Sequence, residues 1–170
     1  MTIRLAGPIQ PDSIVDGEGI RTVIWTQGCS HNCLGCHNPE THSFTGGYEV
    51  DIEDVLNEID NLEYQDGITL SGGDPFFQIK PCSVIAKYAH QKGLNVWAYT
   101  GFTFEQLLLM MKNNPDLVEL LSNIDILIDG KFDINKKSLN CKFRGSTNQR
   151  VIDVSKSLKN NKVVIVKKYK

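Results

Sequence analysis

The chain has 170 residues, 41% of them hydrophobic, which is enough for one domain with a substantial core. Its net charge of −2, with Lys and Arg spread along the chain, excludes the strong basic excess typical of nucleic-acid binders, and no apolar run approaches the ~20 residues that span a bilayer. The first residues lack the apolar core of a secretion signal, so we expect a single cytoplasmic domain over residues 1–170 that binds neither nucleic acid nor membranes.

Strands and helices are predicted to alternate along the chain. Arg21–Thr26 is β-branched and aromatic and indicates a strand, and Asp51–Leu62 places apolar residues at helical spacing behind acids in its first turn. The remaining predicted elements are a strand at Gly67–Leu70, a helix at Pro81–Gln91, a strand at Leu94–Tyr99, a helix at Phe104–Lys112 with Thr103 as its N-cap, a short helix after Pro115, and strands at Ile124–Ile128, Val151–Val154 and Val163–Val166.

Repeated strand–helix units of this length favour a parallel sheet with right-handed crossovers. A closed eightfold barrel typically needs ~250 residues, more than this chain has. We therefore predict an α/β fold, a partial, open TIM-like barrel of about five or six parallel strands with outer helices. The notable motifs all follow strand ends, which is the edge where α/β folds bind ligands, so we expect them to share one mouth.

Three cysteines lie within eight residues in the spacing C-x3-C-x2-C: Cys29, Cys33 and Cys36. A structural zinc ion or a fully ligated iron–sulfur cube takes four protein ligands. Three thiolates on a cube leave one iron open to a small molecule, so the spacing indicates a reactive [4Fe–4S] cluster. A zinc site completed by His31 or His37 is the alternative interpretation, and the odd count of five cysteines disfavours a disulfide framework.

The C-x3-C-x2-C spacing is the signature of the radical S-adenosylmethionine (SAM) enzymes, and this sequence resembles them. In many members the residue before the last cysteine is aromatic; here it is Gly35, and the ring is displaced to His37. The loop Gly72-Gly73-Asp74-Pro75 is similar to the Gly-Gly-Glu-Pro loop of the superfamily. The resemblance implies that the three cysteines hold the cluster and that SAM binds around Cys36 and at this glycine loop. There, exposed carbonyls and the Asp74 carboxylate would accept hydrogen bonds from the SAM ammonium group.

Two further strand ends carry polar candidates for SAM binding. Lys131 is a candidate partner for the SAM carboxylate, with Asp129 orienting it or holding a cation. A strand-end turn with a surface lysine is the alternative interpretation of this segment. The Thr100 hydroxyl would contact SAM or cap Tyr99. Radical chemistry needs no general base, and we assign no catalytic acid or base.

Three other segments extend the resemblance. Asp16–Arg21 is similar to the N-terminal motif of glycyl-radical activating enzymes, and we interpret Arg21 as structural. Cys36–His42 and Phe143–Arg150 resemble the activating proteins of anaerobic (class III) ribonucleoside-triphosphate reductases. The residues of the second block alone reveal no chemistry. The similarity runs from about Gly7 to Val154, which is nearly the whole chain.

This resemblance implies a specific oxidoreductase function. The cluster would take one electron from a donor such as a flavodoxin and cleave SAM to methionine and a 5′-deoxyadenosyl radical. That radical would abstract a hydrogen atom from a glycine of the reductase large subunit, which is the expected partner. The alternatives are another short radical SAM enzyme, similar to 7-carboxy-7-deazaguanine synthase or to a pyruvate formate-lyase activase, and a non-enzymatic zinc-binding interaction module.

Overall fold

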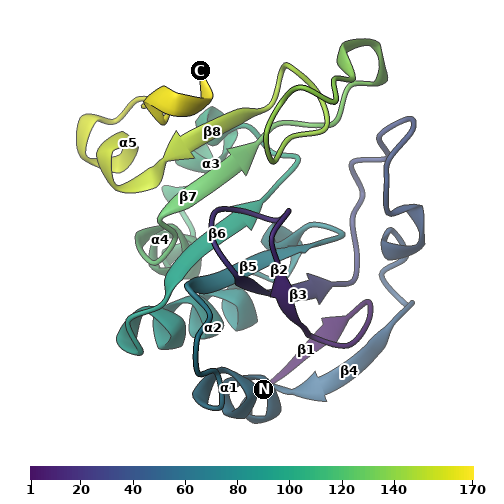
Figure 1. Ribbon diagram of the computed structural model, residues 1–170, viewed down its shortest axis with the longest axis vertical. Coiled ribbons are helices and arrows are strands. Elements are labelled where there is room, and N and C mark those ends of the chain that lie inside the picture. The colour runs from purple at the N-terminus through teal and green to yellow at the C-terminus, as the bar shows by residue number, and fades with distance from the viewer.

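The computed structural model describes residues 1–170, and a mixed eight-stranded sheet runs through it (Figure 1). The strand order is β4-β1-β3-β5-β6-β7-β8, and β2 pairs with β3 beside this path. The strands are β1 (Thr2–Leu5), β2 (Gln10–Ser13), β3 (Arg21–Thr26), β4 (Tyr48–Asp51), β5 (Gly67–Gly72), β6 (Asn95–Tyr99), β7 (Ile126–Asp129) and β8 (Arg150–Asp153). The helices are α1 (Ile52–Asp60), α2 (Ile79–Gln91), α3 (Phe104–Met111), α4 (Pro115–Ser122) and α5 (Val154–Asn160).

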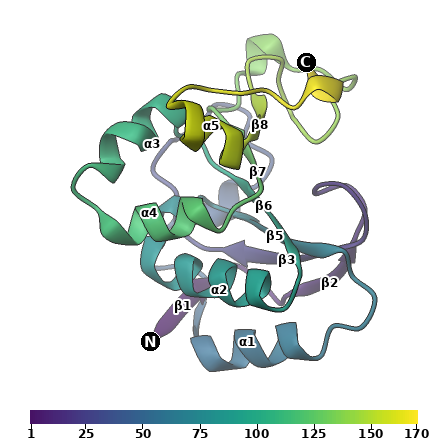
Figure 2. The same cartoon turned by 90° about the vertical axis from the view of Figure 1, so that its left-hand side faces the viewer.

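The centre of the sheet is parallel and is formed by β3, β5, β6 and β7. Helices lie in each connection between these strands, and Figure 2 shows them as a layer over one face of the sheet. Right-handed crossovers place successive helices on the same face when strands are added in one direction. The opposite face of the sheet and the ends of its strands are therefore covered by loops and not by these helices.

The number of parallel strands differs from the prediction of five or six. Four strands are parallel, and β8 runs antiparallel to β7, because the loop of residues 130–149 that joins them contains no crossover helix. The predicted strand Val163–Val166 contributes only one bridge, between Ile165 and Ile152. The strands β1, β2 and β4 were not predicted; they form antiparallel pairs at the other side of the sheet. The sheet is open, because its outer strands β4 and β8 do not pair.

The main apolar core lies between the sheet and the helix layer and contains 24 buried residues. In α1, Val55 and Ile59 are buried one turn apart, as the helical spacing predicted, and in α2 Cys82 is fully buried. Thr103 caps α3 through a capping box with Gln106. No helix is both long enough and apolar enough to span a membrane.

Arg21 is a fully buried structural residue at the start of β3. Its guanidinium donates hydrogen bonds to Thr69 Oγ1 at 2.8 Å and to the carbonyls of Glu18 at 2.9 Å and Asn95 at 3.1 Å, and it lies 5.3 Å from the ring centroid of Trp97. Burial lowers the pKa of Arg21 to about 10. The side chain therefore ties the loop before β3 to the neighbouring strands β5 and β6.

We predict that Arg21→Ala lowers the free energy of unfolding by roughly 3 kcal/mol, because buried carbonyls lose their donors. Arg4→Ala is the matched control: Arg4 is more exposed and pairs with Glu49 at 3.4 Å, so its loss should cost less than about 1 kcal/mol. Urea denaturation of both variants followed by circular dichroism measures the difference. Equal losses would contradict the structural role of Arg21.

Candidate functional site

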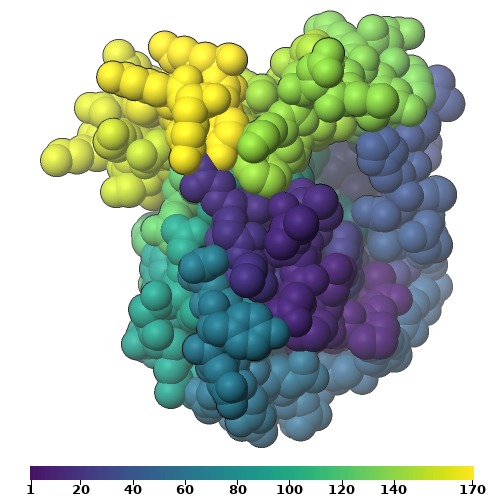
Figure 3. Space-filling model, viewed as in Figure 1, coloured from purple at the N-terminus to yellow at the C-terminus, as the bar shows by residue number.

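A cavity of about 390 Å³ opens where the parallel strands end, and 23 residues line it. It lies between the cysteine loop (residues 27–38) and the β7–β8 loop, where the space-filling view shows a recess (Figure 3). Residues from the ends of four strands meet there, among them Cys29 after β3, Gly72 of β5, Thr100 after β6 and Lys131 after β7. The predicted convergence of these loops on one mouth is confirmed.

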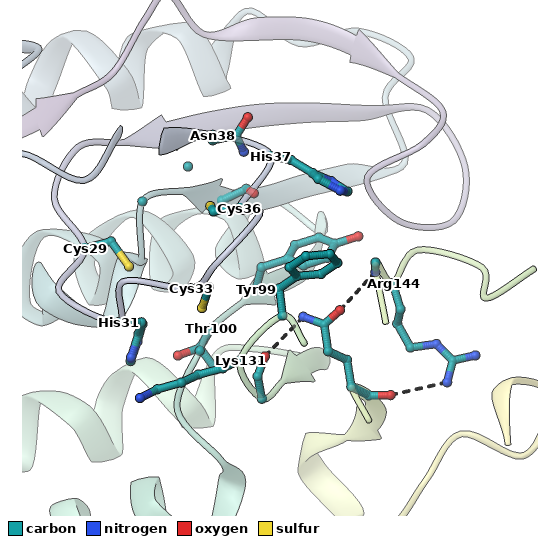
Figure 4. A pocket seen from close by; sticks show the side chains of 18 of the residues that line it. Cys29, His31, Cys33, Cys36, His37, Asn38, Tyr99, Thr100, Lys131 and Arg144 are labelled. Carbon is teal, nitrogen blue, oxygen red and sulfur yellow. Dashed lines mark hydrogen bonds between the residues drawn. The ribbon is translucent and has the colours of Figure 1, made fainter. Parts of the chain in front are cut away.

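The three cysteines of the motif all line this cavity and are half-buried (Figure 4). None of them forms a disulfide. Burial raises the pKa of Cys29 to about 11, and burial also raises the pKa of Cys33. The metal-free Cys29 and Cys33 thiols are therefore protonated at neutral pH, and metal binding must release protons from them.

The arrangement of the thiols fits a multi-iron cluster better than a single ion. No three Cys, His, Asp or Glu side chains gather around one point as a zinc site requires. His31 is engaged elsewhere, with Nε2 2.6 Å from Asp74 Oδ2, and the His37 ring packs against Phe132 at 5.1 Å between centroids. In a [4Fe–4S] cube each cysteine binds a different iron, so the three thiols that line the cavity need not meet at one point. The donor set therefore fits a [4Fe–4S] cluster with three protein ligands.

Two glycines bring the end of β5 against the cysteine loop. Gly72 has a φ of +109°, and a Cβ there would lie 2.3 Å from the carbonyl oxygen of Thr26. A Cβ on Gly73 would lie 2.5 Å from the carbonyl oxygen of Gly28. Both glycines line the cavity, so their backbone is available to a ligand that a side chain would exclude.

The Asp74 carboxylate is buried, and it does not line the cavity. Its Oδ2 accepts hydrogen bonds from His31 Nε2 at 2.6 Å and from Thr100 Oγ1 and the Gly101 amide, both at 2.9 Å. Its Oδ1 accepts from the Phe76 amide at 2.9 Å. Four donors fill the acceptor sites of a carboxylate. Asp74 thus joins three loops, and its predicted contact with a SAM ammonium group stays a prediction.

Two other predicted residues also lie outside the cavity lining. Asp129 is buried, and its Oδ2 accepts from Arg150 at 2.5 Å and from the Phe104 amide at 2.8 Å, which fixes the start of α3 to β7 and β8. Gly35 has a φ of +75° and lies against Ile134, whose Cδ1 would be 2.4 Å from a Cβ at that position. Asp129 thus joins structural elements through hydrogen bonds and Gly35 packs between two loops, and the predicted role of each in SAM binding stays a prediction.

The remaining predicted residues do line the cavity: Cys36, His37, Thr100 and Lys131. Thr100 does so while its hydroxyl bonds to the Asp74 carboxylate. Lys131 is exposed and forms no ion pair in the chain, and its charge opposes the rise in the pKa of the Cys33 thiol that burial causes. An anionic ligand group in the cavity would therefore meet an uncompensated cation.

Sequence reasoning missed two residues of the site. His42 Nε2 lies 3.3 Å from Cys36 Sγ, and its only sequence signal is its place at the end of the block Cys36–His42. Gln149 folds the β7–β8 loop over the cavity: its Oε1 accepts from the Gly145 amide at 2.9 Å and its Nε2 donates to the Gly130 carbonyl at 3.1 Å (Figure 4). The block Phe143–Arg150 thus forms part of the cavity wall.

We predict that Asp74→Asn lowers the free energy of unfolding by roughly 1–3 kcal/mol, because an amide nitrogen cannot accept from His31, Thr100 and Gly101. Hydrogen exchange should also speed up at the Gly101 amide but not at Leu70, which lies within the sheet. Asp133→Asn is the control, since its carboxylate accepts only from the nearby Asn135 amide. Unchanged exchange at Gly101 would show that the carboxylate does not hold these loops.

Comparison with known proteins identifies the family of the chain. A family model described as a 4Fe-4S single cluster domain matches residues 15–152. The anaerobic ribonucleoside-triphosphate reductase-activating protein of Pasteurella multocida (strain Pm70) is 33% identical over 147 residues, which cover 82% of this chain and 90% of the relative. The protein of the same name from Escherichia coli (strain K12) is 31% identical over 149 residues, covering 83% and 93%.

Among solved structures, QueE from Escherichia coli aligns over 61% of this chain and 54% of its own, with a TM-score of 0.46 and 18% identity. The family match spans all three cysteines and every strand end that borders the cavity. The chain therefore belongs to the family of anaerobic ribonucleoside-triphosphate reductase-activating proteins.

Proposed function

We propose that this protein is a radical SAM glycyl-radical activase for the large subunit of an anaerobic ribonucleoside-triphosphate reductase. One observation carries the proposal: three half-buried thiols, and no fourth cysteine, line a single cavity together with a glycine-rich strand end. Bound together, a [4Fe–4S] cluster and SAM supply one-electron cleavage of a sulfonium and a 5′-deoxyadenosyl radical. The whole chain would act as one radical SAM domain, and its open sheet as a partial TIM-like barrel.

The cysteine loop would hold the cluster through Cys29, Cys33 and Cys36. Their partial burial lowers solvent access, which is one of the factors that set cluster potential. His42 contacts Cys36 Sγ at 3.3 Å, and hydrogen bonds to ligating sulfur are a second such factor. The protein would therefore tune the cluster potential through the burial of the cysteine loop and through His42.

The cavity offers one cationic group and several hydrogen-bond acceptors, which suit the carboxylate and the ammonium group of SAM. The Lys131 ammonium would pair with the carboxylate, and backbone carbonyls at Gly72 and Gly73 would accept from the ammonium group. Asp74 would act indirectly, because its hydrogen bonds fix Thr100 and the glycine loop in place. These groups would bind and orient the ligand, and the loops around them would limit access of water.

The open sheet suits a protein substrate. The outer strands β4 and β8 do not pair, so the cavity mouth is bordered by loops instead of a closed ring of strands. A glycine-bearing loop of the reductase large subunit would enter the cavity between the loops that border its mouth. The electron would come from a carrier such as a flavodoxin.

We predict that Cys29→Ala, Cys33→Ala and Cys36→Ala each abolish reductive SAM cleavage and lower bound iron well below the roughly four atoms of a full cluster. Cys141→Ala is the control, because Cys141 lies outside the cavity lining. Iron and sulfide analysis after anaerobic reconstitution gives the first readout, and methionine release gives the second. A motif variant that keeps full iron and cleavage would remove its cysteine from the ligand set.

We also expect the wild-type protein, mixed with the reductase large subunit, SAM and dithionite, to produce a glycyl-radical doublet in an electron paramagnetic resonance spectrum. A large subunit with its radical-site glycine replaced by alanine is the control and should give no doublet. SAM cleavage without a doublet in a competent assay would point to a different substrate.

A further inference from the structure

A positively charged lobe lies beside the cavity. Residues 131–149, which we call the basic lobe, carry five Lys and Arg side chains and one acid, Asp133, although the whole chain has a net charge of −2. The first 130 residues have the opposite balance, with 18 Asp and Glu against six Lys and Arg. Residues 150–170 are basic as well, with seven Lys and Arg against one Asp, so the lobe is the part of a basic C-terminal region that borders the cavity.

The cations of the basic lobe are not neutralised within the chain. No carboxylate lies within 4.0 Å of any of them, and all but the partly buried Arg144 are exposed. They are Lys131, Lys136, Lys137, Lys142 and Arg144. A cluster of unpaired surface cations creates a positive electrostatic field, which attracts acidic molecules and raises the rate at which they associate with the protein.

The base of this lobe packs directly on the cysteine loop. The Phe132 ring lies 5.1 Å from the His37 ring, and Ile134 fills the space beside Gly35. Next to this contact, Leu34 projects from the cysteine loop with 78% of its surface exposed. A protein seated on the lobe would therefore lie next to the ligands of the cluster.

We propose that the basic lobe and the tip of the cysteine loop form the docking surface for an acidic one-electron carrier protein of the flavodoxin kind. This inference depends on the proposed function, since an electron is needed only if the cavity holds a cluster. One electron leaves the reduced carrier, which is oxidised by one electron, and the cluster is reduced by one electron. No bond forms or breaks in this step, and no proton has to move.

The shape and chemistry of the surface favour a carrier over the reductase subunit. Electron-transfer partners associate through small, short-lived interfaces, and complementary charge increases their association rate. A lobe of unpaired cations with two exposed leucines, Leu139 in the lobe and Leu34 in the cysteine loop, matches that pattern. The reductase subunit must instead insert a loop into the cavity, whose mouth lies on the inner side of the lobe.

The test uses charge reversal of the three lobe lysines that do not line the cavity, in the variant Lys136→Glu/Lys137→Glu/Lys142→Glu. The matched control makes the same change in charge at exposed lysines near α3 and α5, in Lys112→Glu/Lys159→Glu/Lys162→Glu. Both variants must match the wild type in circular dichroism and iron content. Calorimetry with oxidised flavodoxin at low ionic strength measures the Kd of each reconstituted protein.

We expect flavodoxin to bind the lobe variant about 10-fold or more weakly than the wild type, and salt to weaken wild-type binding. The control should stay within about twofold. In stopped-flow experiments, reduced flavodoxin should reduce the cluster of the lobe variant about 10-fold more slowly, whereas reduction by dithionite should match the control.

Unchanged flavodoxin affinity in the lobe variant, or an equal loss in both variants, would overturn the proposal. A normal flavodoxin rate with a lower glycyl-radical yield under dithionite would overturn it too, because the lobe would then dock the reductase subunit. Failure of wild-type protein to cleave SAM with dithionite would instead contradict the proposed function. The binding comparison does not depend on SAM cleavage, so the two failures are distinguishable.

Discussion

One buried carboxylate holds the strand-end loops of the site together. Asp74 follows β5, and its oxygens accept from His31 in the cysteine loop and from Thr100 and Gly101 after β6. A buried charge without such donors would cost several kcal/mol, so each loop is held at the position where it can supply one. The cysteine loop is therefore positioned by a polar network that does not include the three cysteines of the motif.

The location of the cavity follows from the asymmetry of the fold. All the helices cover one face of the sheet, so the apolar core forms there and the strand ends face loops on the other side. Because β4 and β8 do not pair, the mouth is bounded by the cysteine loop and the β7–β8 loop. This short chain therefore has a cavity of a size for a small molecule, and the mouth of that cavity is bounded by loops between which part of a protein could enter.

The sequence predicted the parallel centre of the sheet, because strand–helix alternation is a local pattern. The count of three cluster ligands also depends on a local pattern, the cysteine spacing, and stays a prediction. Sequence reasoning missed β2, a four-residue strand whose first three residues are exposed and show no apolar alternation. The direction of β8 depends on the path of the β7–β8 loop, which composition does not determine. The orientation of the Asp74 side chain depends on donors that lie 26 to 43 residues away along the chain. The residues around Asp74 in the sequence would be the same whether its carboxylate contacted a ligand or joined a buried network.

The β7–β8 loop shows how cofactor binding and partner selection can occupy one segment without interfering. Its inner wall is fixed by Gln149, which bonds to backbone groups of Gly145 and Gly130, and by the packing of Phe132 on the cysteine loop. Lys136 and Lys137 are exposed and take no part in the cavity lining. Substitutions on the outside can therefore change the charge presented to partners while the backbone that faces the cavity stays in place. Within one family, this separation would allow the surface to adapt to different partner proteins around an unchanged radical site.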